Sequence, residues 1–324
     1  MIQLDGIHKR FRVMRRGAGF GAAARALFSR EYEHIEALRD VSFTVPEGQV
    51  VGYIGPNGAG KSTTIKIMCG VLRPDSGSCL IDGRVPWLER KAHVRHIGAV
   101  FGQRSQLWWD VPVIDSFELI RDIYRVDKPD YARRLEELSA LLDLEQILRT
   151  PARSLSLGQR MRCELAASLL HGPRILFLDE PTIGLDAVSK LAVRQFIRRQ
   201  SQEHGTTVIL TTHDMQDIEA LAQRIILIGK GQILLDGSLA QLKQRAGGHK
   251  TLTFLYAGEE PGLQPGMRLV SSAPGRLVLT LDPALCSLSQ AIGSLSAQSE
   301  LLDISVQDQS AEELVAGLYR EFHI

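Results

Sequence analysis

The segment GPNGAGKS at residues 55–62 constrains the fold more than any other, because it matches the phosphate-loop pattern G-x-x-x-x-G-K-[ST]. An apolar run, VVGYI at residues 50–54, precedes it, and a segment with helical character, residues 63–69, follows it. Glycines let the backbone turn so tightly that several N–H groups point at one anion, and the helix N-terminus adds partial positive charge. A chance match would lack this context. The sequence therefore predicts a strand, a nucleotide phosphate site and a helix, in that order.

Two side chains of this loop have separate expected tasks. Lys61 is expected to neutralise the β- and γ-phosphates, and the Ser62 hydroxyl is placed to ligate Mg²⁺. The residues expected to hold the nucleotide here are Gly55, Pro56, Asn57, Gly58, Ala59, Gly60, Lys61, Ser62 and Thr63.

Composition limits the class of protein. The chain has 324 residues, enough for one large domain and a small one. Its formal net charge is +1, so no broad attraction to nucleic acid is implied. Its four cysteines are scattered, which favours reduced thiols in a cytosolic protein over a zinc site or a disulfide frame. We find no signal peptide and no run near the ~18 apolar residues of a membrane span, so a membrane part would have to come from another chain.

Apolar runs recur along most of the chain and indicate an α/β fold. They lie at residues 50–54, 97–101, 175–178, 208–211 and 225–228, and several precede segments with helical spacing. This order predicts a largely parallel sheet with crossover helices in a domain of residues 1–246. Within it, residues 12–34 form a basic, Ala/Gly-rich insertion between two strand-like pieces. Residues 247–324 have alternating strand-like pieces and a final helical one, so we expect a small, separate α+β domain there.

A second motif, ILFLDEPT at residues 175–182, is a buried strand that ends in two carboxylates. Asp179 is expected to hold the Mg²⁺ shell, and Glu180 to accept a hydrogen bond or a proton from the attacking water. The bland alternative is a pair that only caps the strand. The phosphate loop upstream favours the functional interpretation, because Mg²⁺-bound nucleotide needs such a carboxylate.

Between these motifs, LSLGQRMRCELAASLLHGP at residues 155–173 places a serine, a glycine and a glutamine before an amphipathic helix. The N-terminus of that helix is another potential anion site. A nucleotide already held by residues 55–62 does not need a second one. An economical explanation is that this site serves a nucleotide bound to another copy of the chain.

The set GPNGAGKST, LSLGQ, ILFLDEP, GLD at residues 184–186 and TTHD at residues 211–214, in this order and spacing, resembles an ATP-binding cassette (ABC) ATPase over about residues 1–240. The resemblance implies a P-loop NTPase fold with a parallel core sheet, an antiparallel β-subdomain and a helical subdomain at about residues 104–173 that carries the LSLGQ signature. It also implies hydrolysis of ATP to ADP and phosphate with Mg²⁺, in a dimer that sandwiches two ATPs and closes on binding them.

The resemblance assigns further residues to the site. Phe11 would stack on the adenine, Gln103 would contact Mg²⁺ and the attacking water, and His213 would sense the γ-phosphate. The second copy would use Ser156, Gly158 and Gln159 on that phosphate, with Asp186 across the dimer interface.

Each assignment has an alternative, and two positions depart from the family pattern. Phe11 and His213 could be core residues, Gln103 a surface amide and Asp186 a helix N-cap. Leu157 stands where many members have a second glycine, which we expect to leave function intact. An extra glycine before Gln103 leaves Gln106 as the alternative ligand, although Gln103 keeps the family's spacing to Val113.

The segment VFGQRSQLWWDV at residues 100–111 holds two of the three tryptophans. In the family it borders the groove that receives a helix of the membrane partner, so we expect Trp108 or Trp109 to contact that helix. The alternative is that both pack into the helical subdomain. The basic insertion at residues 12–34 could likewise meet lipid headgroups or the partner, or be a solvated loop.

Several segments resemble bacterial exporter ATPases with a short C-terminal appendage. They are the GQRSQLWWD segment, the block from SLGQ to GLD, and the C-terminal ending. The resemblance implies integral-membrane permease subunits as separate chains, a second cassette in a homodimer, and a peripheral position on the cytoplasmic face of the bacterial inner membrane. The alternatives are a soluble ABC ATPase in DNA repair, translation or cluster assembly, and a regulatory ATP-binding module with weak hydrolysis. Glu180 and His213 argue against the last.

Overall fold

The computed structural model describes residues 1–14, 32–102, 104–241, 249–308 and 311–321. The chain divides into two compact units, Met1–Asp236 and Gly237–Ile324. The division therefore falls at residue 236, before the expected boundary at residue 246. Of the insertion expected at residues 12–34, residues 15–31 lie outside the described residues.

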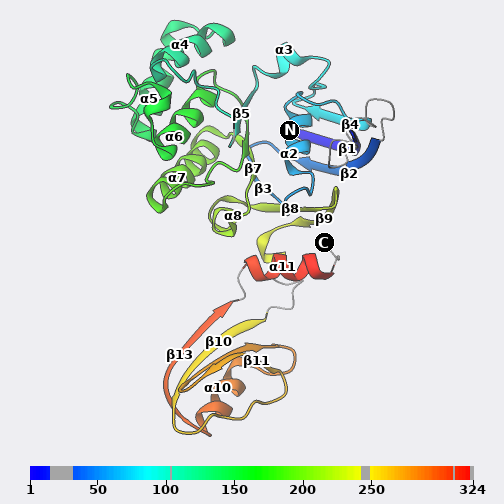
Figure 1. The fold of residues 1–324 in the computed structure, drawn as a ribbon, viewed down its shortest axis with the longest axis vertical. Coiled ribbons are helices and arrows are strands. Elements are labelled where there is room, and N and C mark those ends of the chain that lie inside the picture. Colours follow the sequence, from blue (N-terminus) through cyan, green and yellow to red (C-terminus); the bar gives the residue numbers. More distant parts are fainter. Residues whose placement is uncertain (15–31, 103, 242–248, 309–310, 322–324) are drawn as a thin grey trace, which may run out of the picture. The chain divides into compact units, whose positions relative to one another are not determined.

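The first unit is built on a six-stranded sheet in its middle (Figure 1). Its strands are β3 (Val50–Ile54), β5 (Ile97–Phe101), β6 (Ile175–Asp179), β7 (Thr207–Thr211), β8 (Arg224–Gly229) and β9 (Gln232–Gly237). Their order is β5-β6-β7-β3-β8-β9, and the first five pair in parallel. Strands β3 and β7 are buried along their whole length, as expected for apolar runs covered on both faces.

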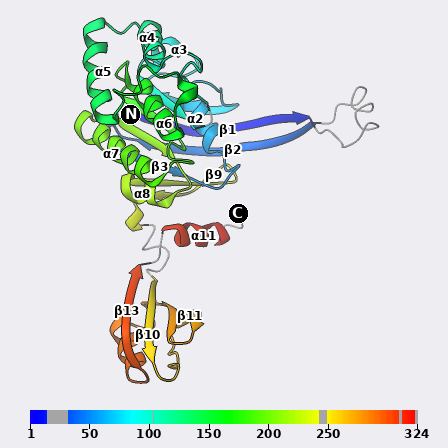
Figure 2. The same cartoon turned by 60° about the vertical axis from the view of Figure 1, so that its left-hand side comes forward.

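A separate antiparallel sheet of three strands lies beside the core sheet. Its strands are β1 (Ile2–Met14), β2 (Tyr32–Val45) and β4 (Ser76–Ile81), in the order β2-β1-β4. Strands β1 and β2 run together well beyond the rest of the unit, as a long hairpin (Figure 2). Where the hairpin leaves the body, Lys9 binds Asp75 at 2.8 Å. Its buried residues, including Ile2 and Val45, pack in one cluster with residues of the core sheet such as Val51 and Tyr53.

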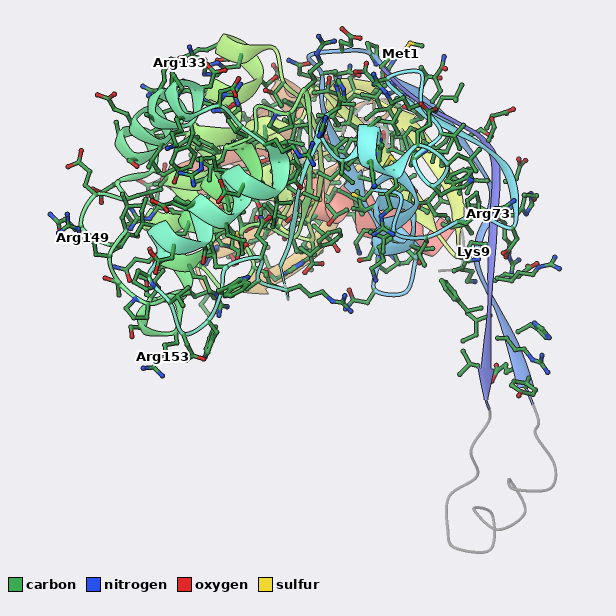
Figure 3. The ribbon with its side chains drawn as sticks, turned by 90° about the horizontal axis from the view of Figure 1, so that it is seen from above. Met1, Lys9, Arg73, Arg133, Arg149 and Arg153 are labelled. Carbon is green, nitrogen blue, oxygen red and sulfur yellow. The ribbon has the colours of Figure 1, made fainter. Side chains whose placement is uncertain are left out.

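Helices of the first unit cover the core sheet and form a group beside β5. They are α2 (Lys61–Met68), α3 (Arg90–His93), α4 (Val113–Tyr124), α5 (Lys128–Leu142), α6 (Leu157–Leu169), α7 (Ala187–His204) and α8 (Met215–Leu221), with the 3-10 turn η1 (Ala152–Ser154). Helices α4, α5 and α6 make up the group beside β5 (Figure 1), within the expected helical subdomain. Arg133, Arg149 and Arg153 lie along its outer side (Figure 3).

Three of these helices begin at caps that matter for the site. Ser156 caps α6 in a reciprocal capping box with Gln159, Asp186 caps α7, and Asp214 caps α8. Each cap side chain accepts a hydrogen bond from a backbone N–H of the first turn. The three cap residues belong to the LSLGQ, GLD and TTHD motifs, so each of these motifs lies at the N-terminus of a helix.

The second unit has its own sheet and core. Its elements are β10 (Lys250–Ala257), β11 (Met267–Ala273), β12 (Arg276–Leu281), α10 (Leu288–Ser296), β13 (Glu300–Asp308) and α11 (Ala311–Glu321). The four strands are antiparallel in the order β11-β12-β10-β13. Phe254 and Leu277 of the sheet share a buried cluster with Ala291 and Leu295 of α10, so the sheet covers its apolar face with that helix. This unit is α+β, as the alternating pieces predict.

In the part of the chain that the structure describes, no helix has both the length and the apolar character that crossing a membrane requires.

Candidate functional site

The phosphate loop lies between β3 and α2, as the sequence predicts. Gly60, the residue before α2, has φ 110°, and a Cβ there would come within 2.7 Å of the Ala37 carbonyl oxygen, so only glycine fits. Lys61 is 6% exposed, and its Nζ donates to the carbonyl oxygens of Gly55 at 2.6 Å and Pro56 at 3.1 Å. Its ammonium group therefore lies across the loop, where a bound phosphate chain would meet it.

Two opposing effects act on the pKa of Lys61. Burial lowers its pKa, while the nearby carboxylates of Glu180 and Asp179 act in the opposite direction. The two carboxylates thus face the cation of the phosphate loop across one site.

A cavity of about 720 Å³ opens over the loop and joins the motifs. Its lining residues are Gly55, Pro56, Asn57, Ser62, Lys66, Phe101, Gly102, Arg104, Asp179, Glu180, Ile183 and His213. The sequence motifs of the loop, the acidic strand end and the TTHD segment therefore meet at one place, because β3, β6 and β7 are adjacent parallel strands whose carboxyl ends lie at the same edge.

Asp179 is held in place at the end of β6 by two hydroxyl groups. Thr211 of the neighbouring strand donates to its Oδ1 at 2.6 Å, and the Ser62 Oγ lies 3.4 Å from the same oxygen. A carboxylate and a serine hydroxyl are hard oxygen ligands, the kind that Mg²⁺ prefers. The donor set fits Mg²⁺ bound together with phosphate oxygens. Among the described residues there is no group of three or more His, Cys, Asp and Glu side chains that could hold a metal.

Glu180 has a backbone conformation that is rare for a glutamate, with φ 56°. Its N–H donates to both the carbonyl oxygen and the Oγ1 of Thr211, at 3.0 and 3.1 Å. The surrounding structure thus holds a conformation that costs energy, a pattern common at functional sites. The Glu180 Oε1 lies 3.6 Å from the His213 Nδ1. The His213 side chain is 63% exposed, so it is not a core histidine.

The signature residues lie outside that cavity. Ser156 is exposed at the start of α6, and Gly158 lies so close to α7 that a Cβ would meet the Ser189 Oγ at 2.4 Å. Ser189 in turn donates from its N–H and its hydroxyl to Asp186, and these hydrogen bonds lower the pKa of Asp186. Neither Ser156, Gly158, Gln159 nor Asp186 is among the described residues that line the cavity. Asp186 is a helix N-cap, the alternative role that the sequence left open for it.

Leu157 lies beside these residues with its side chain 40% exposed. A Cβ on Gly184, which has φ 70°, would come within 2.9 Å of its Cδ2. The leucine that replaces the family's glycine therefore packs against Gly184 and leaves the backbone around Ser156 in a regular capping box.

For two expected site residues, Gln103 and Phe11, the described structure shows no contact with the cavity. Gln103 lies outside the described residues, between Gly102, whose N–H donates to the Asp179 carbonyl oxygen at 2.9 Å, and Arg104. Phe11 is half-buried in β1 opposite Ile35, and it is not among the described residues that line the cavity. Both assignments stay predictions.

Sequence reasoning missed Glu164, a buried carboxylate in the middle of α6. It accepts hydrogen bonds from the Ser105 hydroxyl and, at 3.2 Å, from the Gln106 N–H. The Gln106 amide donates to the Glu164 carbonyl oxygen at 3.2 Å, so the alternative ligand Gln106 is engaged with α6. Burial raises the pKa of Glu164, against the influence of these hydrogen bonds. A charged residue among the apolar positions of CELAASL was the available signal.

The tryptophan pair lies just beyond this attachment. Trp108 and Trp109 are 59% and 51% exposed, so neither is buried within the helical subdomain. The backbone N–H of Trp108 donates to the Ser116 hydroxyl of α4 at 3.0 Å. The Arg160 guanidinium lies 5.7 Å from the Trp109 ring centre. Exposed aromatic rings on a backbone fixed by hydrogen bonds are typical of binding surfaces.

Next to the tryptophan segment is a groove of about 260 Å³ between the core sheet and the helical group. Apolar and basic side chains line it together, among them Val71, Arg90, Val94 and Arg104. Two other lining residues, Tyr124 and His171, stack with ring centres 4.0 Å apart. Burial lowers the pKa of His171 to about 4, so this ring is neutral near pH 7.

Comparison with known proteins gives the family. Residues 38–183 match the family model described as ABC transporter. YhcH of Bacillus subtilis, an ABC transporter ATP-binding protein, is 34% identical over 61% of this chain and 63% of its own length. The import ATP-binding protein SsuB 2 of Pseudomonas aeruginosa, named for aliphatic sulfonates, is 35% identical over 77% of this chain and 89% of its own. The linearmycin resistance ATP-binding protein LnrL of Bacillus subtilis is 28% identical over 87% and 93%.

Among solved structures, a dimeric ATP-binding cassette in a post-hydrolysis state, bound to ADP and Pi, has TM-score 0.62 and 27% identity. The match covers 74% of this chain and 99% of the cassette. The phosphate loop, the acidic strand end and the histidine thus meet in a fold that binds adenine nucleotides in a relative. The chain belongs to the ABC transporter family as an ATP-binding protein, an ABC-type ATPase.

Proposed function

We propose that two copies of this chain bind and hydrolyse ATP with Mg²⁺ and thereby drive export through separate membrane permease subunits. The observation that carries the ATPase part is the single cavity in which the phosphate loop, Asp179, Glu180 and His213 meet. The transport part rests on the family and on the groove lined by Arg104, Ser105 and Gln106, which closely precede the tryptophan pair in sequence.

The site residues divide the chemistry among them. Lys61 and the N–H groups of the phosphate loop bind the β- and γ-phosphates. Ser62, Asp179 and Gln103 would hold Mg²⁺, which when bound would neutralise charge on the phosphate oxygens. Glu180 accepts a hydrogen bond or a proton from the attacking water. His213, 3.6 Å from Glu180, donates toward the γ-phosphate and keeps the glutamate oriented.

The second copy completes each site. Ser156 is exposed at the N-terminus of α6, where its hydroxyl and the first N–H groups of the helix can meet an anion outside this chain. The cavity of one chain holds no signature residue among its described lining. We propose that the γ-phosphate of one copy meets Ser156, Gly158 and Gln159 of the other. As the family resemblance implies, Phe11 would stack on the adenine and Asp186 would lie near the contact.

The groove and the tryptophan pair suit a helix of a permease on the cytoplasmic face of the membrane. Amphipathic helices bind apolar grooves through spaced side chains, and exposed tryptophans are frequent energetic centres of such interfaces. Glu164 joins the segment that carries the tryptophans to α6, which carries Ser156 at its start. A permease bound at the groove is therefore mechanically connected to the signature of the same chain.

Export rather than import is proposed because LnrL, a resistance protein, aligns over more of the chain than the import protein SsuB 2 does. The longer alignment exceeds the length of the first unit, so it includes part of the second. We propose that the second unit is an accessory domain of this exporter type.

The test is a pull-down from detergent-solubilised membranes with tagged chain that carries Glu180→Gln, in the presence of ATP and Mg²⁺. Polytopic membrane proteins at a stoichiometric ratio are the expected result. A chain that co-purifies only with soluble proteins would contradict the transport assignment and support the alternative, an ABC ATPase without a transport role.

We predict that Trp108→Ala and Trp109→Ala will weaken binding of the permease more than they affect the isolated chain. Truncating an interface tryptophan costs about 2 kcal/mol or more, some 30-fold in affinity. Because both rings are exposed, ATP turnover of the isolated chain should stay within about two-fold. The measurement compares co-purified permease and turnover for each variant, with Ile123→Ala, another exposed apolar residue, as the control. Wild-type binding in both tryptophan variants would contradict the prediction.

A further inference from the structure

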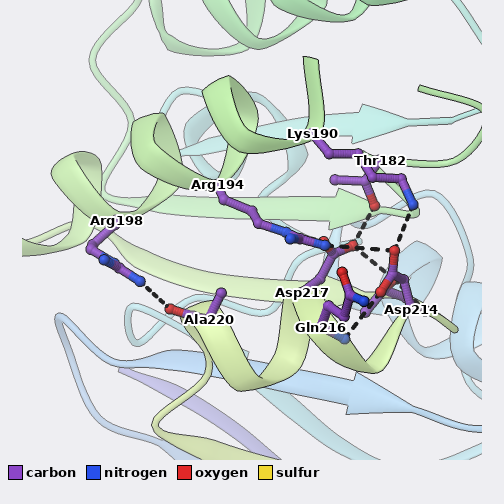
Figure 4. A network of polar contacts seen from close by, with 9 residues as sticks. Thr182, Lys190, Arg194, Arg198, Asp214, Gln216, Asp217 and Ala220 are labelled. Carbon is purple, nitrogen blue, oxygen red and sulfur yellow. Dashed lines mark hydrogen bonds and ion pairs between the residues drawn. The ribbon is translucent and has the colours of Figure 1, made fainter. Parts of the chain in front are cut away.

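A fully buried carboxylate, Asp217 of α8, connects three segments that each carry an expected site residue (Figure 4). It accepts hydrogen bonds from Thr182, which follows Glu180 by two residues, and from Thr212, which precedes His213, the latter at 3.1 Å. The Nε of Arg194 donates to its other oxygen at 2.6 Å. Arg194 belongs to α7, the helix that Asp186 caps.

A neighbouring carboxylate extends the connection. Asp214 caps α8, accepts from Lys190 of α7 at 2.6 Å, and lies 3.6 Å from Arg194. Its own N–H donates to the Thr212 hydroxyl at 3.0 Å. Lys190 and Arg194 of α7 thus bind the carboxylates at the start of α8, which begins immediately after the His213 segment (Figure 4).

The network does not reach the nucleotide cavity. Asp217 and Thr182 are buried, and neither is among the described residues that line it. Helices α7 and α8 also bury apolar residues, including Phe196, Ile197 and Ile218, which give the fold much of its packing energy. A buried ion pair adds little net stability over an apolar replacement, so stability alone is a weak reason for it.

We propose that Asp217 is a positioning residue for ATP hydrolysis: it sets Glu180, His213 and the Asp186 turn in one fixed arrangement relative to each other. Through Thr182 it holds the turn that follows the left-handed Glu180 backbone, and through Thr212 it holds the strand end before His213. Through Arg194 the same carboxylate is joined to α7. A displacement of the Asp186 turn by the second copy would therefore reach Glu180 and His213 together.

The proposal rests on the roles proposed for Glu180 and His213, and its test is done on the isolated full-length chain. Asp217→Asn keeps the shape of the side chain but replaces one acceptor oxygen by an amide donor that faces Thr182, Thr212 or Arg194. We expect kcat to fall about 10- to 100-fold, the range typical when a group that orients a site residue is removed. ATP affinity, set at the phosphate loop, should stay within about two-fold.

A double-mutant cycle separates positioning from general destabilisation. If Asp217 acts through Glu180, Asp217→Asn should lower the residual turnover of a Glu180→Gln chain much less than that of the wild type. Thr182→Val should reproduce part of the loss in kcat and be non-additive with Asp217→Asn. The matched control is Glu203→Gln, which removes the exposed pair between Arg199 and Glu203 on α7.

Three results would overturn the proposal. They are unchanged kcat in Asp217→Asn, an equal factor lost in the presence and absence of Glu180, and a fall in ATP affinity and melting temperature that accounts for the loss of turnover. Wild-type chain without ATPase activity would instead contradict the proposed function. That outcome is read from the wild type alone, so the two failures can be told apart.

Discussion

Glu180→Gln is expected to reduce ATP turnover by about 10²- to 10⁴-fold, the contribution typical of a general base. Glutamine has the same shape, but it cannot take a proton from water. The backbone at residue 180 should keep its conformation, because Thr211 binds the Glu180 N–H and not the side chain. ATP affinity should therefore stay near the wild-type value.

The same substitution should trap the dimer, because ATP that is bound but not hydrolysed keeps the two chains closed around both nucleotides. Size-exclusion chromatography with ATP and Mg²⁺ is expected to show a stable dimer for Glu180→Gln and a largely monomeric wild type. Glu219→Gln, an exposed glutamate of α8, is the control and should behave as the wild type. Turnover reduced less than ten-fold would mean that Glu180 is not the base.

The core of the site could be predicted because its motifs depend on backbone geometry that few residues permit. Gly60 must be glycine beside the Ala37 carbonyl group. Asp179 ends a strand whose other residues are all apolar, and Glu180 follows it directly. Parallel strands then bring their carboxyl ends to one edge, so motifs far apart in sequence meet. These features are local in sequence, or follow from strand order alone.

The polar residues behind the site could not be predicted, because their partners are distant in sequence. Asp217 pairs with Thr182 and Arg194, and Glu164 pairs with Ser105, from other elements in each case. On sequence alone, a helical aspartate or glutamate is most economically assigned to a solvated face. The two compact units divide after Asp236, whereas the change in sequence pattern predicts a second domain from residue 247 onward.

The strongest test of the shared site uses two inactive chains. Lys61→Met removes the buried cation of the phosphate loop, and Ser156→Asp places a negative charge where the partner's γ-phosphate would bind. Each is expected to lower turnover at least about 10²-fold, since transition-state charge loses a preorganised partner. Aspartate is itself a good N-cap, so α6 should remain capped. Ser156→Asn, a cap without charge, is the control and should retain more activity.

Mixing the two chains distinguishes a site built from two copies from a site contained in one. In a mixed dimer, one nucleotide would meet both substitutions, while the other would meet the intact Lys61 of one chain and the intact Ser156 of the other. Random pairing makes half of the dimers mixed, so up to about a quarter of the wild-type sites should be restored. Turnover that stays at the level of the separate variants would contradict the shared site, because each chain would then need both residues. Recovery that rises with the fraction of mixed dimers would mean that Ser156 acts on the nucleotide of the second copy.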